Sequence, residues 1–169
     1  MSEEIVNKVS QSQLVQIDLD DFLPKSRPEA YDLAQNLYQG LVLREKDFRQ
    51  FINEFDWLKY QHKRVAVFCS ADAIVPNWAY MLIASKMNAV GAKCSFGSVE
   101  EVMEKELVQS IKDADLSSFK NKKVLIKGCG SFELSPFVYV EITTLLQPLV
   151  NSLMFGEACS TVPVYKMRQ

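Results

Sequence analysis

The sequence has few glycines, one histidine and no long run of charge of one sign. Six glycines stand among 169 residues, and none forms a Gly-rich phosphate signature, so we do not expect nucleotide binding. A catalytic triad would have to use His62, which lies at the opposite end of a predicted strand from Cys69. The 19 basic and 21 acidic residues give a net charge of −2 without a basic block, which predicts no nucleic-acid partner.

Membrane and export signals are also absent from the sequence. Residues Met1–Ile5 lack the basic start and apolar run of a signal peptide, and no uninterrupted apolar stretch reaches membrane-spanning length. We therefore expect a cytoplasmic protein without a membrane partner. In that reducing compartment the four cysteines are expected as thiols or metal ligands rather than as disulfides.

What is present is a hydrophobic content of 48%, enough for one α/β domain over residues 1–169. Buried-strand runs and helical periods alternate, which predicts a three-layer fold with a mostly parallel sheet. We expect an N-terminal region over residues 1–55, a first β-α-β unit over 56–97, a connecting helix over 98–114, a second β-α-β unit over 115–156 and a C-terminal extension over 157–169.

The N-terminal region is predicted to be an antiparallel strand-helix addition. Residues 14–18 favour an edge strand, and residues 28–36 favour a short helix. Residues 37–43 then favour a second strand, and the apolar spacing over residues 47–55 is helical.

The two β-α-β units resemble one another in sequence, which predicts an internal duplication with the same strand order in each. The alignment needs one extra residue in the second unit before Cys129, and the original offset returns before Phe155-Gly156. The residues Asp56, Lys63, Val65, Cys69, Pro76 and Phe96-Gly97 align with Asp115, Lys122, Val124, Cys129, Pro136 and Phe155-Gly156.

Three cysteines follow predicted strands. Cys69, Cys129 and Cys159 stand just past strands that we expect at one sheet, and ligands of such sheets gather at the carboxyl ends of the strands. Neighbouring strands are about 4.8 Å apart, so the three sulfurs are expected around one site. Cys94 falls within a strand and is expected in the core.

Three thiolates alone do not close a four-ligand zinc site. Asp72, Glu133 and Glu157 are near in sequence and are candidate further ligands for zinc, whereas an iron–sulfur cluster keeps one iron open. We therefore expect a metal- or cluster-binding protein that acts in cluster handling, redox sensing or a metal-assisted reaction. Two alternatives stay open, a thiol-dependent enzyme or redox sensor, and a non-catalytic interaction domain with structural cysteines.

The closing residues 160–169 are extended by composition. They favour an edge strand or a segment that docks beside a second subunit, so a homodimer is a further expectation.

Three blocks carry a family resemblance, and each contains one of the three cysteines. They are residues 65–80, 126–129 and 156–166, and they make the chain similar to an uncharacterised bacterial family, domain of unknown function 2480. The resemblance spans nearly the whole chain and implies no assigned activity. It implies iron–sulfur assembly proteins as partners, since members of the family are associated with iron–sulfur assembly genes. A looser likeness to quinolinate synthase concerns architecture alone, repeated α/β units that each give one cysteine to a cluster.

Overall fold

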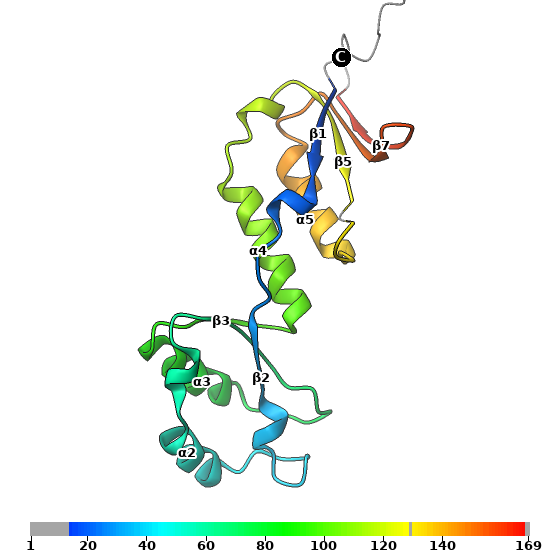
Figure 1. Ribbon diagram of the computed structural model, residues 1–169. Coiled ribbons are helices and arrows are strands. Elements are labelled where there is room, and N and C mark those ends of the chain that lie inside the picture. Colours follow the sequence, from blue (N-terminus) through cyan, green and yellow to red (C-terminus); the bar gives the residue numbers. More distant parts are fainter. Residues whose placement is uncertain (1–13, 129, 168–169) are drawn as a thin grey trace, which may run out of the picture. The chain divides into compact units, whose positions relative to one another are not determined.

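The computed structural model describes residues 14–128 and 130–167, and their contacts divide the chain into two compact units (Figure 1). Unit 1 comprises Met1–Pro24 and Glu104–Gln169, and unit 2 comprises Lys25–Met103. Unit 2 is thus an insertion between the two segments of unit 1. The structure confirms the α/β class with mostly parallel strands, and its helices packed on sheets are consistent with a three-layer arrangement.

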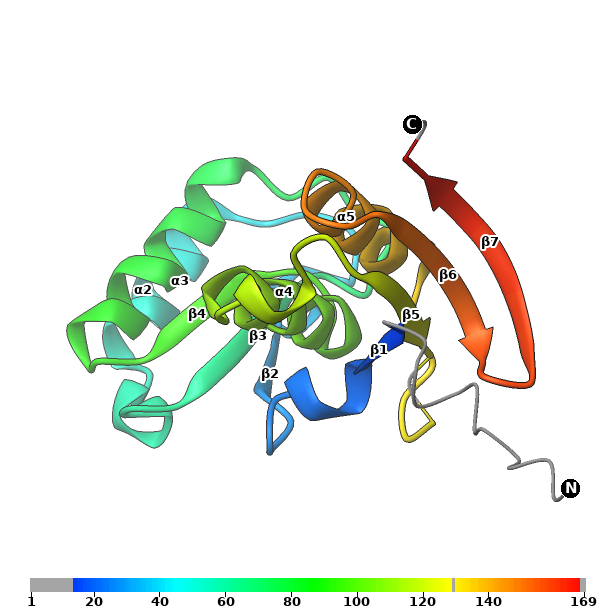
Figure 2. The same cartoon turned by 90° about the horizontal axis from the view of Figure 1, so that it is seen from above.

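Unit 1 is built on a four-stranded sheet, sheet A, with the order β1-β5-β6-β7. Strands β1, β5 and β6 are parallel, and β7 returns antiparallel to β6, as the red hairpin in Figure 2 shows. Its elements are β1 (Leu14–Asp18), η1 (Leu19–Phe22), α4 (Val99–Asp113), η4 (Ser117–Phe119), β5 (Lys123–Lys127), α5 (Pro136–Leu146), β6 (Ser152–Glu157) and β7 (Ser160–Lys166). Helix α4 begins in unit 2 and enters unit 1 at Glu104.

Unit 2 is built on a three-stranded parallel sheet, sheet B, with the order β2-β3-β4. Its elements are β2 (Glu29–Asp32), η2 (Leu33–Asn36), α2 (Glu45–Glu54), η3 (Trp57–Tyr60), β3 (Arg64–Phe68), α3 (Asn77–Ala89) and β4 (Lys93–Phe96). In each sheet one strand lies between two parallel partners, β5 between β1 and β6 and β3 between β2 and β4. Each carries three consecutive buried residues, as expected for strands covered on both faces.

Helical spacing explains how each core forms. In α5 the buried residues are Val138, Ile142 and Leu146, four positions apart on one face, and they join the apolar side of sheet A. In α3 the same spacing buries Ala79, Ile83 and Met87 against sheet B. Each unit therefore has its own apolar core.

The two units repeat one another over nearly their whole length. In sheet B the first residues of β3 and β4, Arg64 and Lys93, are paired, as the first residues of β5 and β6, Lys123 and Ser152, are in sheet A. Counting along the strands from these pairs gives every residue of β3 and β4 a counterpart in unit 1. Local backbone geometry repeats too. His62 and Asn121, before β3 and β5, have φ of 57° and 58°. Gly97, directly after β4, and Gly156, the second-last residue of β6, have φ of 132° and 121°.

The repeat is longer than the sequence alignment predicted, because β1-η1 and β2-η2 belong to it as well. It also corrects the alignment at the helix starts. Pro76 precedes α3 as its N-cap, whereas Pro136 is the first residue of α5 and Ser135 is its N-cap. The one extra residue of the second unit is therefore compensated before the helix begins, earlier than the sequence alignment required.

The N-terminal region differs from expectation. Both of its strands are parallel to their neighbours, so the predicted antiparallel addition is wrong and the antiparallel strand is the C-terminal β7. Residues 28–36 form β2 and a 3-10 turn rather than a helix, because burial of Tyr31 and Leu33 outweighs the helix propensity of the segment. The predicted strand over 37–43 is a tight turn in which Gln39 and Gly40 have positive φ.

No helix in the described part of the chain is long and apolar enough to cross a bilayer.

Candidate functional site

The predicted site cysteines follow strands of two different sheets. Cys69 follows β3 of sheet B, whereas Cys159 follows β6 of sheet A. Cys129 lies outside the described residues, but Gly128 before it extends from β5 of sheet A. The expectation that all three follow strands of one sheet is therefore wrong. Two of them, Cys129 and Cys159, follow neighbouring parallel strands.

Cys159 lies in the tight turn that joins β6 to β7, and its side chain is exposed. The turn depends on Gly156, which has φ of 121°. A Cβ atom at this position would lie 2.5 Å from the carbonyl oxygen of Ser160, closer than real Cβ contacts allow. Glycine thus fixes the close approach of the two strands that hold Cys159 at the carboxyl edge of sheet A.

Acidic side chains gather at the same edge of sheet A. Lys127, the last residue of β5, places its Nζ 3.4 Å from Oδ2 of Asp18, the last residue of β1. The hydrogen bond and charge of Asp18, and then the charges of Glu157 and Asp20, raise the pKa of Lys127. Three carboxylates therefore act electrostatically on one ammonium group, and such an excess of negative charge attracts cations.

The loop that carries Cys129 is held at both ends. Near its start, Gly130 N donates to Asp20 Oδ2 at 3.0 Å, and Ser131 Oγ donates to Asp20 Oδ1 at 2.6 Å. At its end, Ser135 N and Oγ donate to the carboxylate of Glu104 at 2.5 and 2.6 Å. Glu104 is 6% exposed, so these bonds compensate the cost of burying its carboxylate.

Unit 2 fixes the loop after its middle strand in a similar way. Ser70 N and Oγ donate to the two carboxylate oxygens of Asp32 at 3.0 and 2.5 Å, directly beside Cys69. Burial by itself would raise the pKa of Asp32, but the hydrogen bonds from Ser70 and Ala34 outweigh it and lower the pKa. Cys69 is half-buried, with Sγ 3.7 Å from the carbonyl oxygen of Ala71.

A tyrosine from the following helix reaches back to each loop. Burial, followed by electrostatic interaction with Cys69 and Asp32, raises the pKa of Tyr80. In unit 1 the hydroxyl of Tyr139 would lie 3.5 Å from a Cβ atom at Gly128. Each tyrosine also packs edge-on against the phenylalanine of the third strand, Tyr80 with Phe96 at 5.4 Å and Tyr139 with Phe155 at 5.3 Å between ring centroids.

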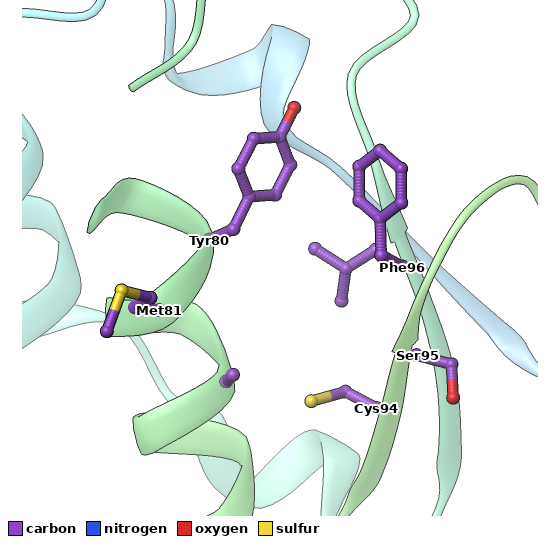
Figure 3. Close-up of a pocket in the computed structure, with 7 residues that line it drawn as sticks. Tyr80, Met81, Cys94, Ser95 and Phe96 are labelled. Carbon is purple, nitrogen blue, oxygen red and sulfur yellow. The ribbon is translucent and has the colours of Figure 1, made fainter. Parts of the chain in front are cut away.

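An apolar groove in unit 2 runs between α3 and β4 (Figure 3). Its volume is about 230 Å³, and a wider hollow continues along the same two elements. Figure 3 shows the Cys94 sulfur pointing from β4 towards α3, with the rings of Tyr80 and Phe96 at one end. The lining residues are Val67, Tyr80, Met81, Ala84, Cys94, Ser95 and Phe96. Cys94 is therefore a half-buried wall of this groove rather than a fully enclosed core residue.

The predicted carboxylate ligands fall on both units. Glu157 is the last residue of β6 and takes part in the charge cluster around Lys127, while Glu133 is exposed in the loop before α5. Asp72 is exposed in the loop of unit 2, after Cys69. The described residues, which do not include Cys129, contain no group of three or more His, Cys, Asp or Glu side chains arranged to hold a metal ion.

Sequence reasoning missed the acids that hold the two loops, Asp20, Asp32 and Glu104. A signal for one of them, Asp32, was present. The dipeptide Asp18-Leu19 at the end of the first N-terminal strand recurs as Asp32-Leu33 at the end of the second. Reading this as part of the duplication would have placed an acid at the carboxyl edge of each sheet.

Comparison with known proteins gives a family but no activity. Residues 3–167 match the model of a family described as "Protein of unknown function (DUF2480)", and the chain belongs to that family. No curated protein matches the chain. No solved structure matches it either.

Proposed function

We propose that this member of the DUF2480 family binds a metal through Cys129 and Cys159 at the carboxyl edge of sheet A. The observation that carries the proposal is the pairing of β5 with β6, because the segments with the two cysteines then leave neighbouring parallel strands at the same edge. Thiolates are the ligands that zinc and iron prefer in proteins.

The surroundings of this edge support a cation. Asp18, Asp20 and Glu157 outnumber Lys127 there, so the edge carries negative charge. The hydrogen bonds of Gly130 and Ser131 to Asp20 restrict the backbone next to Cys129, which lowers the entropy cost of closing a ligand set.

Two ligand sets are compatible with this arrangement. With Glu157, two residues before Cys159, the pair of thiols gives three protein ligands and leaves the fourth position of a zinc ion to water. An iron–sulfur cluster needs at least one further thiol, and Cys69 is the candidate from the sequence. The participation of Cys69 in a shared site stays a prediction.

Metal and acid-labile sulfide analysis of anaerobically purified protein tests the proposal. We expect about one zinc per chain, or iron with sulfide, and loss of the metal in C129S and C159S. C94S is the matched control, because Cys94 lies on β4 in unit 2 and should not alter metal content. Zinc without sulfide indicates a zinc site, iron with sulfide indicates a cluster, and loss of either metal in C69S would add Cys69 to the ligands. Metal-free wild-type protein that takes up neither zinc nor iron when reconstituted would overturn the proposal.

A further inference from the structure

The clearest difference between the two units is a strand. In unit 1 the third strand, β6, is covered by β7, whereas its counterpart β4 in unit 2 has β3 as its only strand neighbour within the described part of the chain. Residues of β4 and α3 line the groove at this edge. An exposed strand edge is a template for a further strand.

Unit 1 shows how such an edge is covered. Tyr165 of β7 stands opposite Leu153 and packs against the core of unit 1, where Leu153 is fully buried. The counterpart of Leu153 is Cys94, which is half-buried and lines the groove. The groove in unit 2 therefore lies beside the position that Tyr165 covers in unit 1.

The charge at the edge differs between the units as well. Lys166 of β7 stands opposite Ser152 in unit 1. The counterpart of Ser152 is Lys93, which is exposed. Because like charges directly opposite each other destabilise strand pairs and opposite charges stabilise them, an acidic residue suits this position in unit 2.

We infer that β4 binds an extended segment of a partner protein, which adds antiparallel to β4 with an aromatic residue opposite Cys94 and an acidic residue opposite Lys93. The aromatic ring fills the apolar groove between α3 and β4, beside Met81 and Ala84. This is binding by strand addition, in which the backbone gives affinity and the two side chains give specificity. It is independent of metal binding in unit 1.

A labelled peptide of sequence Ser-Thr-Val-Pro-Val-Tyr-Glu tests the inference, because it repeats β7 with its final lysine changed to glutamate. Fluorescence anisotropy should show saturable binding to the full chain. Changing the peptide tyrosine to alanine should weaken binding at least about tenfold, since it removes a buried ring. Restoring the final lysine should weaken it about threefold.

Two variants locate the binding site. Ala84→Phe places a ring in the groove and should abolish binding, with circular dichroism as the check on folding. Lys93→Glu keeps the fold, because Lys93 is exposed, and should reverse the preference so that the peptide ending in lysine binds more tightly. Absence of binding at millimolar peptide, or equal binding of all peptides to K93E and wild type, would overturn the inference. A dimer in light scattering that A84F converts to monomer would also overturn it, because a second copy would then occupy β4.

Discussion

The two units share a strand order but differ at the edge of the third strand. In unit 1 the hairpin β6–β7 buries Leu153 and presents Cys159 in its turn, whereas in unit 2 the chain passes from β4 through Gly97 and Ser98 into α4. The comparison shows that one repeated module can be specialised by the segment attached to the end of its last strand. Unit 1 gains an exposed cysteine, Cys159, in the hairpin turn, and unit 2 keeps an accessible groove.

The largest expected difference concerns the counterpart residues Leu153 and Cys94. Leu153→Ala should lower the free energy of unfolding by about 3 kcal/mol, because it leaves a cavity in a closed core. Cys94→Ala should cost about 1 kcal/mol or less, because Cys94 already faces a groove.

Urea unfolding measures both values. The two tryptophans, Trp57 and Trp78, lie in unit 2, so their fluorescence follows that unit while far-UV circular dichroism follows both. Equal destabilisation by the two substitutions would show that the edge of β4 is closed in solution.

The acids that hold the two loops should matter to a similar degree, although the counterpart of Asp32 in unit 1 is Asp18 rather than Asp20. Asp32→Ala removes the bonds to Ser70, and Asp20→Ala removes those to Gly130 and Ser131, at a cost of about 1 to 2 kcal/mol each. Hydrogen exchange should become faster at the Ser70 amide in D32A and at the Gly130 amide in D20A, each without effect on the other loop. Unchanged exchange in either variant would break the equivalence of the loops.

The accessible cysteines of the two units should differ in reaction rate. After treatment with a chelator, iodoacetamide should modify Cys159 about fivefold faster than Cys69, because Cys159 is exposed and Cys69 is half-buried. Mass spectrometry of the modified peptides gives both rates. Faster modification of Cys69 would instead favour the thiol-enzyme alternative.

The smallest effect is a pH dependence that belongs to unit 2. The pKa of Asp32 in the folded protein lies below its ordinary value of 3.8, so the folded state binds fewer protons than the unfolded state. The contribution of Asp32 to stability is therefore present above about pH 4 and is lost as the pH falls through its folded pKa. The difference in unfolding free energy between wild type and D32N, a few tenths of a kcal/mol, should shrink below about pH 4. A constant difference from about pH 6 to about pH 3 would contradict this.

Much of the fold was readable from local sequence. The strand 14–18 was predicted with its observed bounds, because it is a short run of strand formers next to turn residues. Residues 28–43 were predicted wrongly, because β2 is held by its pairing with β3, a contact that no local pattern shows.

The site was predictable only in part. Position after a strand is local, so Cys69 and Cys159 were placed correctly just past β3 and β6. Which sheet each strand joins is a long-range property, and it separates Cys69 from the sheet of Cys159. The bond of Asp20 to Gly130 spans 110 residues of sequence, and that of Asp32 to Ser70 spans 38. Nothing in the immediate neighbours of the two acids indicates these partners.

X-ray absorption at the zinc edge tests the central claim most directly. Zinc-loaded wild-type protein should show sulfur scatterers at about 2.3 Å, and C159S should lose part of that shell while C94S keeps it. A shell of oxygen and nitrogen alone at about 2.0 Å, identical in wild type and C159S, would contradict metal binding by Cys129 and Cys159.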